Sequence, residues 1–326
     1  MSTITLPPEL NALSALSLAS SLNSFGTTPE VVVDFSALLS MEPFGLLLTG
    51  AALRTLFRAR NFQRINASGI HAGNPAHEYL AHIGFFKWIG ISAGNAPGGV
   101  TGGITWLPVT TLTRVELNRR SGETGKPLGD VIHQECERLA KLLTQSSQMK
   151  INRPLAYCLR EVIRNVFEHA DADRCVLCAQ RTADGNVELA VIDQGRGIRR
   201  SLEERLTLAS DEEALRAAIK AGVSRRPSDD PDNPWGNSGF GLFVLSELGR
   251  ELGVFRVVSG TAGLHIAGGE SHVEATSFKG TAIQLRLRRR AGTSLVDFIE
   301  SVITRGEATQ GGKHPVRASR STRKIG

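Results

Sequence analysis

The sequence predicts a mixed α/β protein that is divided into two domains. Its 326 residues are enough for two ordinary domains, each with a core of its own. Strand and helix patterns alternate over residues 1–115, and a longer mixture of both extends over residues 130–292. The polar, glycine-containing stretch 116–129 between them predicts a linker, and residues 293–326 form a C-terminal tail.

The first domain, residues 1–115, has the alternation of a small α/β layer. "VVV" at 31–33 predicts a buried strand, and residues 62–69 predict the next one. Residues 44–60 have apolar side chains at three- and four-residue spacing and basic residues at the end, which predicts a helix. Residues 74–91 predict a second helix that leads into a final apolar element, and the glycine-rich segment 92–103 predicts a loop.

Composition and charge narrow the class of protein. Hydrophobic residues at 41% and charged residues at 21% are typical of a globular chain. The apolar run 44–53 is too short to cross a bilayer and the N-terminus lacks a signal-peptide pattern, so we expect a cytoplasmic protein that is not membrane-bound. Most of the net charge of +6 lies in the tail, which predicts partial disorder there. Nucleic acid would be bound only through this basic tail, and a solvated terminus is the alternative.

The sequence contains four cysteines, Cys136, Cys158, Cys175 and Cys178. "CVLC" at 175–178 has the spacing of a zinc-ligand pair. The segment around it predicts a strand, however, and residues three apart on a strand point to opposite faces. Buried thiols are therefore favoured over a zinc site.

The first segment that carries chemistry is the predicted helix 155–170. Glu161, Asn165 and His169 follow one another at four-residue spacing and form one polar stripe beside the apolar face. An amide oxygen can ligate Mg²⁺, and a carboxylate one turn away can orient or deprotonate a water molecule. The stripe therefore predicts a magnesium–phosphate site, with a solvated helix face as the alternative.

The second segment is a predicted buried strand, residues 187–192, that ends in Asp193. Gly195 and Gly197 follow, and glycines allow a ligand to approach the backbone closely. A carboxylate at this position can accept a hydrogen bond from an exocyclic amine such as that of adenine. An ordinary Asp-x-Gly turn is the alternative.

The third segment is a glycine loop, "GNSGFGL" at 236–242, directly before an apolar helix pattern. Backbone N–H groups and the positive end of a helix dipole make such a loop suitable for phosphate, but its G-x-x-G-x-G spacing differs from both the dinucleotide fingerprint and the P-loop. A long polar insertion precedes it, with a helix that is capped near Ser210–Asp211 and stopped at Gly222, which predicts a mobile lid. Lys220, Arg225 and Arg226 of this lid either reach the γ-phosphate or remain solvated.

In this order and spacing, the segments resemble the ATP-binding domain of the GHKL superfamily, which is shared by gyrase B subunits, ninety-kilodalton heat-shock chaperones, mismatch-repair MutL and sensor histidine kinases. "EVIRN" at 161–165 is similar to its N box, "DQGRGI" at 193–198 and "GNSGFGL" to its two glycine boxes, and "KGTAIQLRL" at 279–287 to its glycine-threonine strand. The resemblance covers residues 126–290 and implies a two-layer α/β sandwich, the Bergerat fold, holding ATP under a lid. Asn165 would ligate Mg²⁺ and Glu161 would act as general base. The implied ATP-binding residues are Asn165, Asp193, Gly195, Gly197, Lys220, Arg225, Gly236, Ser238, Gly239, Phe240, Gly241, Leu242 and Thr281.

Residues 1–115 resemble a STAS domain, the fold of anti-sigma-factor antagonists, in the strand, short loop and helix of residues 31–60. The loop that usually carries a phosphorylatable Ser before Gly reads "MEPFG" here, with Phe44 ahead of Gly45, and Ser40 lies earlier in the chain. A scaffold, or docking of a protein partner, fits this sequence better than phosphorylation of the domain.

These resemblances leave several functions open. The first is an ATP hydrolase or an ATP-driven conformational switch, and the second is a serine/threonine protein kinase similar to the anti-sigma kinases. A sensor histidine kinase would need a phospho-acceptor histidine, and the sequence around His133 lacks the Pro and basic residues of that motif. A non-catalytic ATP-binding module has no need of Glu161. The oligomeric state is left open, a homodimer included.

Overall fold

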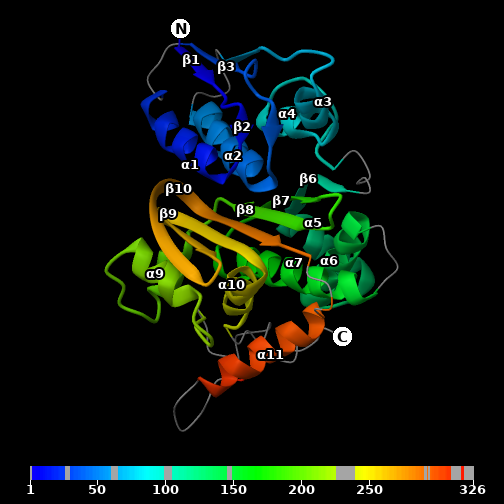
Figure 1. Ribbon diagram of the computed structural model, residues 1–326, viewed down its shortest axis with the longest axis vertical. Helices are drawn as coiled ribbons and strands as arrows, with labels where there is room; N and C mark the ends of the chain where they lie inside the picture. Colours follow the sequence, from blue (N-terminus) through cyan, green and yellow to red (C-terminus); the bar gives the residue numbers. More distant parts are fainter. Residues whose placement is uncertain are drawn as a thin grey trace.

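The computed structural model describes residues 2–25, 30–59, 65–98, 105–144, 149–224, 239–289, 292, 294–309 and 317–318. The mixed α/β class expected from the sequence is confirmed, with helices and three sheets in the described part of the chain. Figure 1 shows an N-terminal unit, in blue and cyan, that lies against one face of a larger sheet.

The N-terminal unit is built on a parallel three-stranded sheet. Its strands are β1 (Ser2–Thr5), β3 (Val31–Asp34) and β5 (Ile65–Ser68), with β3 in the centre, and β2 (Glu9–Leu10) pairs separately with β4 (Ser40–Met41). Its helices are α1 (Ala12–Ser21), the 3₁₀ turn η1 (Leu22–Phe25), α2 (Pro43–Ala59), α3 (Pro75–His82) and α4 (Phe85–Ile89). The strand predicted at 31–33 is confirmed as β3, and the predicted helix 44–60 is confirmed over residues 44–59. Of the predicted strand 62–69, residues 65–68 form β5, and residues 62–64, like residue 60, lie outside the described residues.

Two features of this unit differ from the sequence expectation. The expected helix 74–91 is divided into α3 and α4 at Gly84, whose φ of 82° a non-glycine residue rarely adopts. The strand β1 and the helix α1 were not expected. Helix α1 begins at Asn11, whose side chain accepts a hydrogen bond from the backbone N–H of Ser14 in a reciprocal capping box.

The second unit is built on a five-stranded antiparallel sheet in the order β6-β7-β8-β10-β9. The strands are β6 (Trp106–Thr113), β7 (Arg174–Arg181), β8 (Val187–Asp193), β9 (Gly253–Ala267) and β10 (Glu270–Leu287). Strand β6 belongs in sequence to the first expected domain, yet it pairs with β7 at the edge of this sheet. The domain boundary expected near residue 115 therefore comes after β6 in the sequence, although β6 is part of the second unit.

Helices cover one face of this sheet, as Figure 1 shows. They are α6 (Leu128–Thr144), α7 (Met149–His169) and α10 (Gly241–Leu252), and they share a core with the sheet residues on that side. Two short helices, α8 (Ile198–Leu202) and α9 (Asp211–Ala218), lie beside β9.

The stretch expected to be a linker, residues 116–129, is helical over most of its length. Helix α5 (Arg114–Thr124) begins at Thr113, whose hydroxyl accepts the backbone N–H of Glu116 at 3.2 Å. It ends at Gly125, and α6 begins three residues later, at Leu128. Leu117 of α5 is 1% exposed, so this helix is anchored in the core and does not act as a free connection.

The tail expected to be partly disordered, residues 293–326, begins with a helix, α11 (Leu295–Ala308). Ile299, Val302 and Ile303 recur on one side of this helix and are buried against α7 and α10. Burial of these apolar residues, which recur at helical spacing, stabilises the helix despite the polar composition of the segment. Most of the remaining tail lies outside the described residues.

The other face of the five-stranded sheet packs on α1 and α2 of the N-terminal unit, so both units share a second core. At its centre, the backbone N–H of Phe44 donates to Oε1 of Glu188 on β8 at 3.2 Å. Arg286 forms ion pairs with both Glu188 and Glu42, which precedes α2. The "MEPFG" loop that departs from the STAS pattern is therefore the segment that docks on the sheet.

Strand β7 carries two cysteine side chains into different cores. Cys175 lies in the core on the helix side of the sheet, and Cys178 lies in the core shared with the N-terminal unit. The strand predicted around "CVLC" is confirmed, and its alternation directs the two thiols away from one another. Among the described helices, none is long and apolar enough to span a membrane.

Candidate functional site

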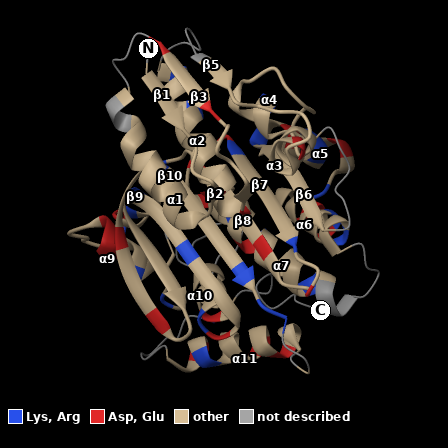
Figure 2. Ribbon diagram, turned by 45° about the horizontal axis from the view of Figure 1, so that its top comes forward, with Lys and Arg blue, Asp and Glu red and all other residues tan. Residues whose placement is uncertain are grey.

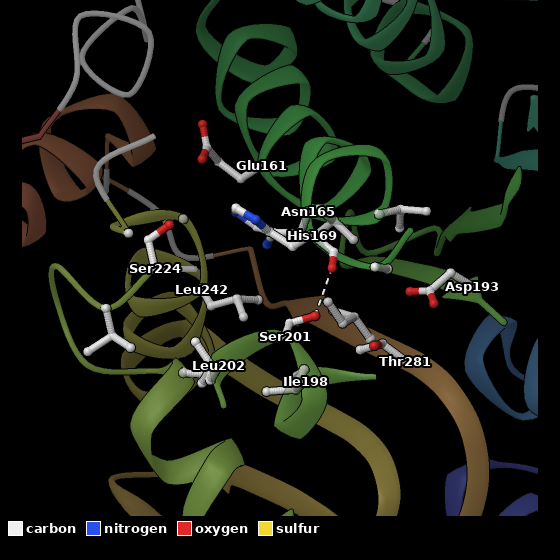
Figure 3. Close-up of a pocket in the computed structure, with 18 of the residues that line it drawn as sticks. Glu161, Asn165, His169, Asp193, Ile198, Ser201, Leu202, Ser224, Leu242 and Thr281 are labelled. Atoms are coloured by element: carbon white, nitrogen blue, oxygen red, sulfur yellow. Dashed lines mark hydrogen bonds between the residues drawn. The ribbon is translucent and has the colours of Figure 1, made fainter. Parts of the chain in front are cut away.

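A pocket opens between α7, α10, the end of β8 and the middle of β10 on the helix side of the sheet, with about 830 Å³ of empty space that includes the open solvent at its mouth (Figure 3). The lining residues come from three parts of the sequence: Glu161, Val162, Asn165, Val166, His169 and Ala170; Asp193, Gly197, Ile198, Ser201, Leu202, Ala218, Val223 and Ser224; and Gly239, Phe240, Gly241, Leu242, Thr281 and Ile283.

Helix α7 supplies the polar stripe predicted from the sequence. Glu161, Asn165 and His169 lie one helical turn apart along one wall of the pocket (Figure 3). Oε1 of Glu161 forms an ion pair of 3.0 Å with the guanidinium of Arg160, so the carboxylate is oriented. Nδ2 of Asn165 is buried and has no hydrogen-bond partner among the described residues. An unsatisfied buried amide costs about 1–3 kcal/mol, so it indicates a position that a ligand completes.

Asp193 lies at the other end of the pocket, where β8 ends (Figure 3). Its Oδ1 accepts the backbone N–H of Gly195 at 2.8 Å, and Thr281 lies opposite it in the β8–β10 register. Burial raises the pKa of the Asp193 carboxyl to about 7, although hydrogen bonds from Gly195 and Thr281 act in the opposite direction. A buried carboxyl that titrates near neutral pH in a pocket is typical of a functional site.

The N-terminus of α10 closes the pocket near Glu161. The helix begins after Phe240, whose side chain forms no cap, so among the described residues no side chain competes with a ligand for the backbone N–H groups of this turn. A Cβ at Gly241 would lie 2.7 Å from Oε2 of Glu161. Glycine at this position thus allows the helix terminus and the carboxylate to meet.

Gly239 shapes the turn that leads into α10. Its φ of +71° lies in the left-handed region, and a Cβ there would lie 2.6 Å from the carbonyl of Val223. The turn is therefore packed directly against the segment that follows α9, and both sides of this contact line the pocket.

Helices α8 and α9 form the remaining wall. The hydroxyl of Ser210 caps α9 by accepting the N–H of Glu213 at 3.1 Å, as the sequence predicted. Asp211 accepts hydrogen bonds of 2.8 Å from both the N–H and the hydroxyl of Thr261 on β9. These hydrogen bonds attach α9 to the sheet. The acidic residues of this helix are coloured red in Figure 2. This part of the expected lid is a packed wall.

The charge of the pocket is informative about its ligand. Glu161 and Asp193 supply two carboxylates, and no Lys or Arg is among the lining residues within the described chain. The nearest cations of α7, Arg160 and Arg164, form ion pairs with Glu161 and Glu168. A metal ion bound together with a polyanionic ligand would offset charge that the described lining does not.

The structure brings nine of the residues implied by the resemblance to one pocket: Glu161, Asn165, Asp193, Gly197, Gly239, Phe240, Gly241, Leu242 and Thr281. Gly195 is not among the lining residues; it packs on α7, where a Cβ would lie 2.1 Å from the carbonyl oxygen of Ala170. Its contribution is the N–H that holds Asp193. Lys220 is exposed and does not line the pocket. Gly236, Ser238, Arg225 and Arg226 lie outside the described residues.

Two residues that line the pocket, Ser201 and Ser224, were not expected from the sequence. Ser201 donates to the carbonyl oxygens of His169 at 2.7 Å and Gly197 at 3.0 Å and thereby ties α8 to α7 (Figure 3). The hydroxyl of Ser224 is buried at the Glu161 side of the pocket and has no hydrogen-bond partner in the described part of the chain. Both are single serines in polar stretches, where no periodicity distinguishes them from solvated residues.

No protein-family model matches the chain, and searches of curated proteins and of solved structures found no match. The assignment of a function therefore depends on the pocket and on the resemblance of the motifs.

Proposed function

We propose that the chain is a magnesium-dependent ATP-binding protein of the GHKL type, whose residues 130–292 form the two-layer Bergerat sandwich, and that it hydrolyses ATP or uses it as a conformational switch in regulation. One observation carries the proposal. Residues of three separate segments, each resembling a motif of that superfamily, line a single pocket: Glu161 and Asn165, Asp193 and Gly197, and Gly239 and Gly241.

The two ends of the pocket suit the two ends of ATP. Asp193 and Thr281 offer a hydrogen-bond acceptor and a hydroxyl for the adenine amine at one end. Glu161 and the uncapped N-terminus of α10 lie at the other end (Figure 3), where the helix dipole and backbone N–H groups favour phosphate.

Asn165 is the residue that would hold Mg²⁺. The metal accepts one or two protein oxygens and completes its coordination with phosphate oxygens and water, so an amide next to the phosphate end is sufficient. Bound there, Mg²⁺ would neutralise phosphate charge that the described lining, with two carboxylates and no basic side chain, does not.

Glu161 is the candidate general base. Arg160 holds Oε1, and Oε2 is directed toward the N-terminus of α10. In the proposed reaction Oε2 accepts a proton from water while the water oxygen bonds to the γ-phosphorus and the bond to the ADP oxygen breaks. The N–H groups of the first turn of α10 stabilise the charge on the transferred group.

A serine/threonine protein kinase is the second candidate, because the same carboxylate can accept a proton from a hydroxyl group. The N-terminal unit packs on the sheet face opposite the pocket, with the N-terminus of α2 held by Glu188. This arrangement favours a scaffold role for the unit over phosphorylation by its own pocket. A kinase substrate would be a separate protein.

Incubation of the full chain with γ-³²P-ATP and Mg²⁺, with and without candidate partner proteins, separates the alternatives. We expect free phosphate from a hydrolase and label on a protein from a kinase. Saturable ATP binding by calorimetry without either product would indicate a switch. The absence of ATP binding in the presence of Mg²⁺ would contradict the proposal as a whole.

A further inference from the structure

A second recess, of about 420 Å³, lies where the N-terminal unit meets the sheet. Helix α2, α4 and the strands β6, β7 and β8 all contribute to it, so it exists only because the two units are docked. The lining residues are Ala51, Arg54, Arg58, Trp88, Thr111, Arg174, Val176, Ile192, Asp193 and Gln194.

Three guanidinium groups converge on this recess. Arg54 and Arg58 are one turn apart on α2, and Arg174 is the first residue of β7. Within the described chain none of them forms an ion pair. Burial, followed by repulsion from Arg58 and Arg174, lowers the pKa of Arg54 to about 10. Like charges are thus brought together without an ion pair to any acid in the described residues.

Two of the three arginines, Arg54 and Arg58, are held in place by uncharged groups. Arg54 donates to the backbone carbonyl of Trp88 and lies 5.7 Å from the centre of its ring. Arg58 donates to Oε1 of Gln194 at 3.0 Å, and Nε2 of Gln194 donates to the hydroxyl of Thr55 at 3.0 Å. Since each guanidinium has five N–H donors, these contacts fix the guanidinium groups of Arg54 and Arg58 and leave donors of both available to a ligand.

Asp193, the carboxyl group that lines the recess, does not neutralise it. Its side chain is 4% exposed and accepts the N–H of Gly195, and its pKa is set by burial and by hydrogen bonds, with no arginine contributing. The recess therefore has a net positive charge. The same residue also lines the larger pocket, so the two sites are separated by the end of β8.

We propose that this recess is a second ligand site that binds a small phosphate-bearing anion. A phosphate dianion presents three oxygens, which match convergent guanidinium groups better than a single carboxylate does. The hydroxyl of Thr111 adds a polar contact, and Ala51, Val176, Ile192 and the Trp88 ring form apolar walls for an organic remainder of the ligand. The proposal does not depend on what the larger pocket binds.

To test this proposal, inorganic phosphate is titrated into the full chain at constant ionic strength without nucleotide, and its affinity is measured by calorimetry. We expect saturable binding with a dissociation constant of about 1 mM or tighter. The variant Arg58→Gln/Arg174→Gln removes two exposed arginines of the recess and is expected to weaken binding at least tenfold. Arg119→Gln removes an equally exposed arginine from α5 and is expected to leave the affinity unchanged.

A second readout locates the bound phosphate. The chain has three tryptophans, and Trp106→Phe/Trp235→Phe leaves Trp88 of the recess as the only fluorophore. Phosphate should change the Trp88 emission with the same midpoint as the calorimetric titration. The proposal is overturned if phosphate does not bind, if Arg58→Gln/Arg174→Gln binds it as the wild type does, or if the Trp88 emission does not respond.

Discussion

Gly241 and Glu161 are in close contact: a Cβ at 241 would lie 2.7 Å from Oε2 and 3.2 Å from Cβ of Glu161. This contact joins the N-terminus of α10 to α7 across 80 residues of sequence, and it places the candidate base beside the candidate phosphate site. The two residues therefore form one structural unit, which can be tested as a pair.

We expect Gly241→Ala to destabilise the protein by about 1–3 kcal/mol, because overpacking at a buried contact outweighs the better helix propensity of Ala. In a Glu161→Ala background the same change should cost less, since the closest atom is gone. Urea unfolding of the four proteins of this double-mutant cycle measures the coupling. Equal costs in both backgrounds would show that the two residues do not touch.

Asn165→Ala should weaken magnesium-dependent ATP binding at least tenfold, because it removes the amide proposed to ligate the metal. Binding that is measured with excess EDTA should change much less. Asn118→Ala, at an exposed position of α5, is the matched control and should bind like the wild type. Calorimetry gives both affinities, and an unchanged affinity of Asn165→Ala would remove this residue from the site.

Glu161→Gln should retain ATP binding and lower the rate of phosphate release at least a hundredfold, because the amide keeps the shape of the side chain but cannot accept the proton. The exposed Glu137→Gln on α6 serves as the control. Comparable phosphate release by Glu161→Gln and the wild type would exclude Glu161 as the base.

Asp193 predicts a pH dependence of stability. Its folded-state pKa of about 7 lies above the ordinary value of 3.8, so the folded protein binds the proton more tightly than the unfolded chain does. The contribution of Asp193 to the free energy of unfolding is therefore largest below pH 4, and it decreases as the pH rises toward 7. Between pH 5 and pH 8 the loss should be about 2–3 kcal/mol.

Asp193→Asn isolates this contribution, since the amide keeps an oxygen for the Gly195 N–H but does not ionise. The free energies of unfolding of the variant and the wild type are measured in urea at pH 5 and at pH 8. Between these two pH values the variant should gain about 2–3 kcal/mol relative to the wild type. A difference that is independent of pH would mean that Asp193 titrates at its ordinary value.

Glu188 is expected to hold the two units together. Glu188→Ala removes the acceptor of the Phe44 N–H and a partner of Arg286, and should destabilise the chain by about 2–3 kcal/mol. Glu270→Ala, at an exposed position of β10, should change the stability by less than about 0.5 kcal/mol. If both variants unfold at the same urea concentration, the contact contributes nothing.

Much of the chemistry could be predicted from short segments. The four-residue spacing of Glu161, Asn165 and His169 determines that they share one wall, and Asp193 follows a strand whose apolar run is visible in the sequence. Helix period and strand period are local properties, so they identify α2, α7, β3 and β8 without knowledge of the fold.

The packing partner of a segment is not determined by the residues of that segment alone, and only the tertiary structure identified it. Strand β6 pairs with β7, which lies 60 residues further along the chain, and α11 is helical because one of its sides finds the core of α7 and α10. Neither partner is encoded in the segment itself. The serines of the pocket wall and the three arginines of the recess are likewise scattered through the sequence. They acquire a common environment only when burial of apolar surface joins the N-terminal unit to the sheet.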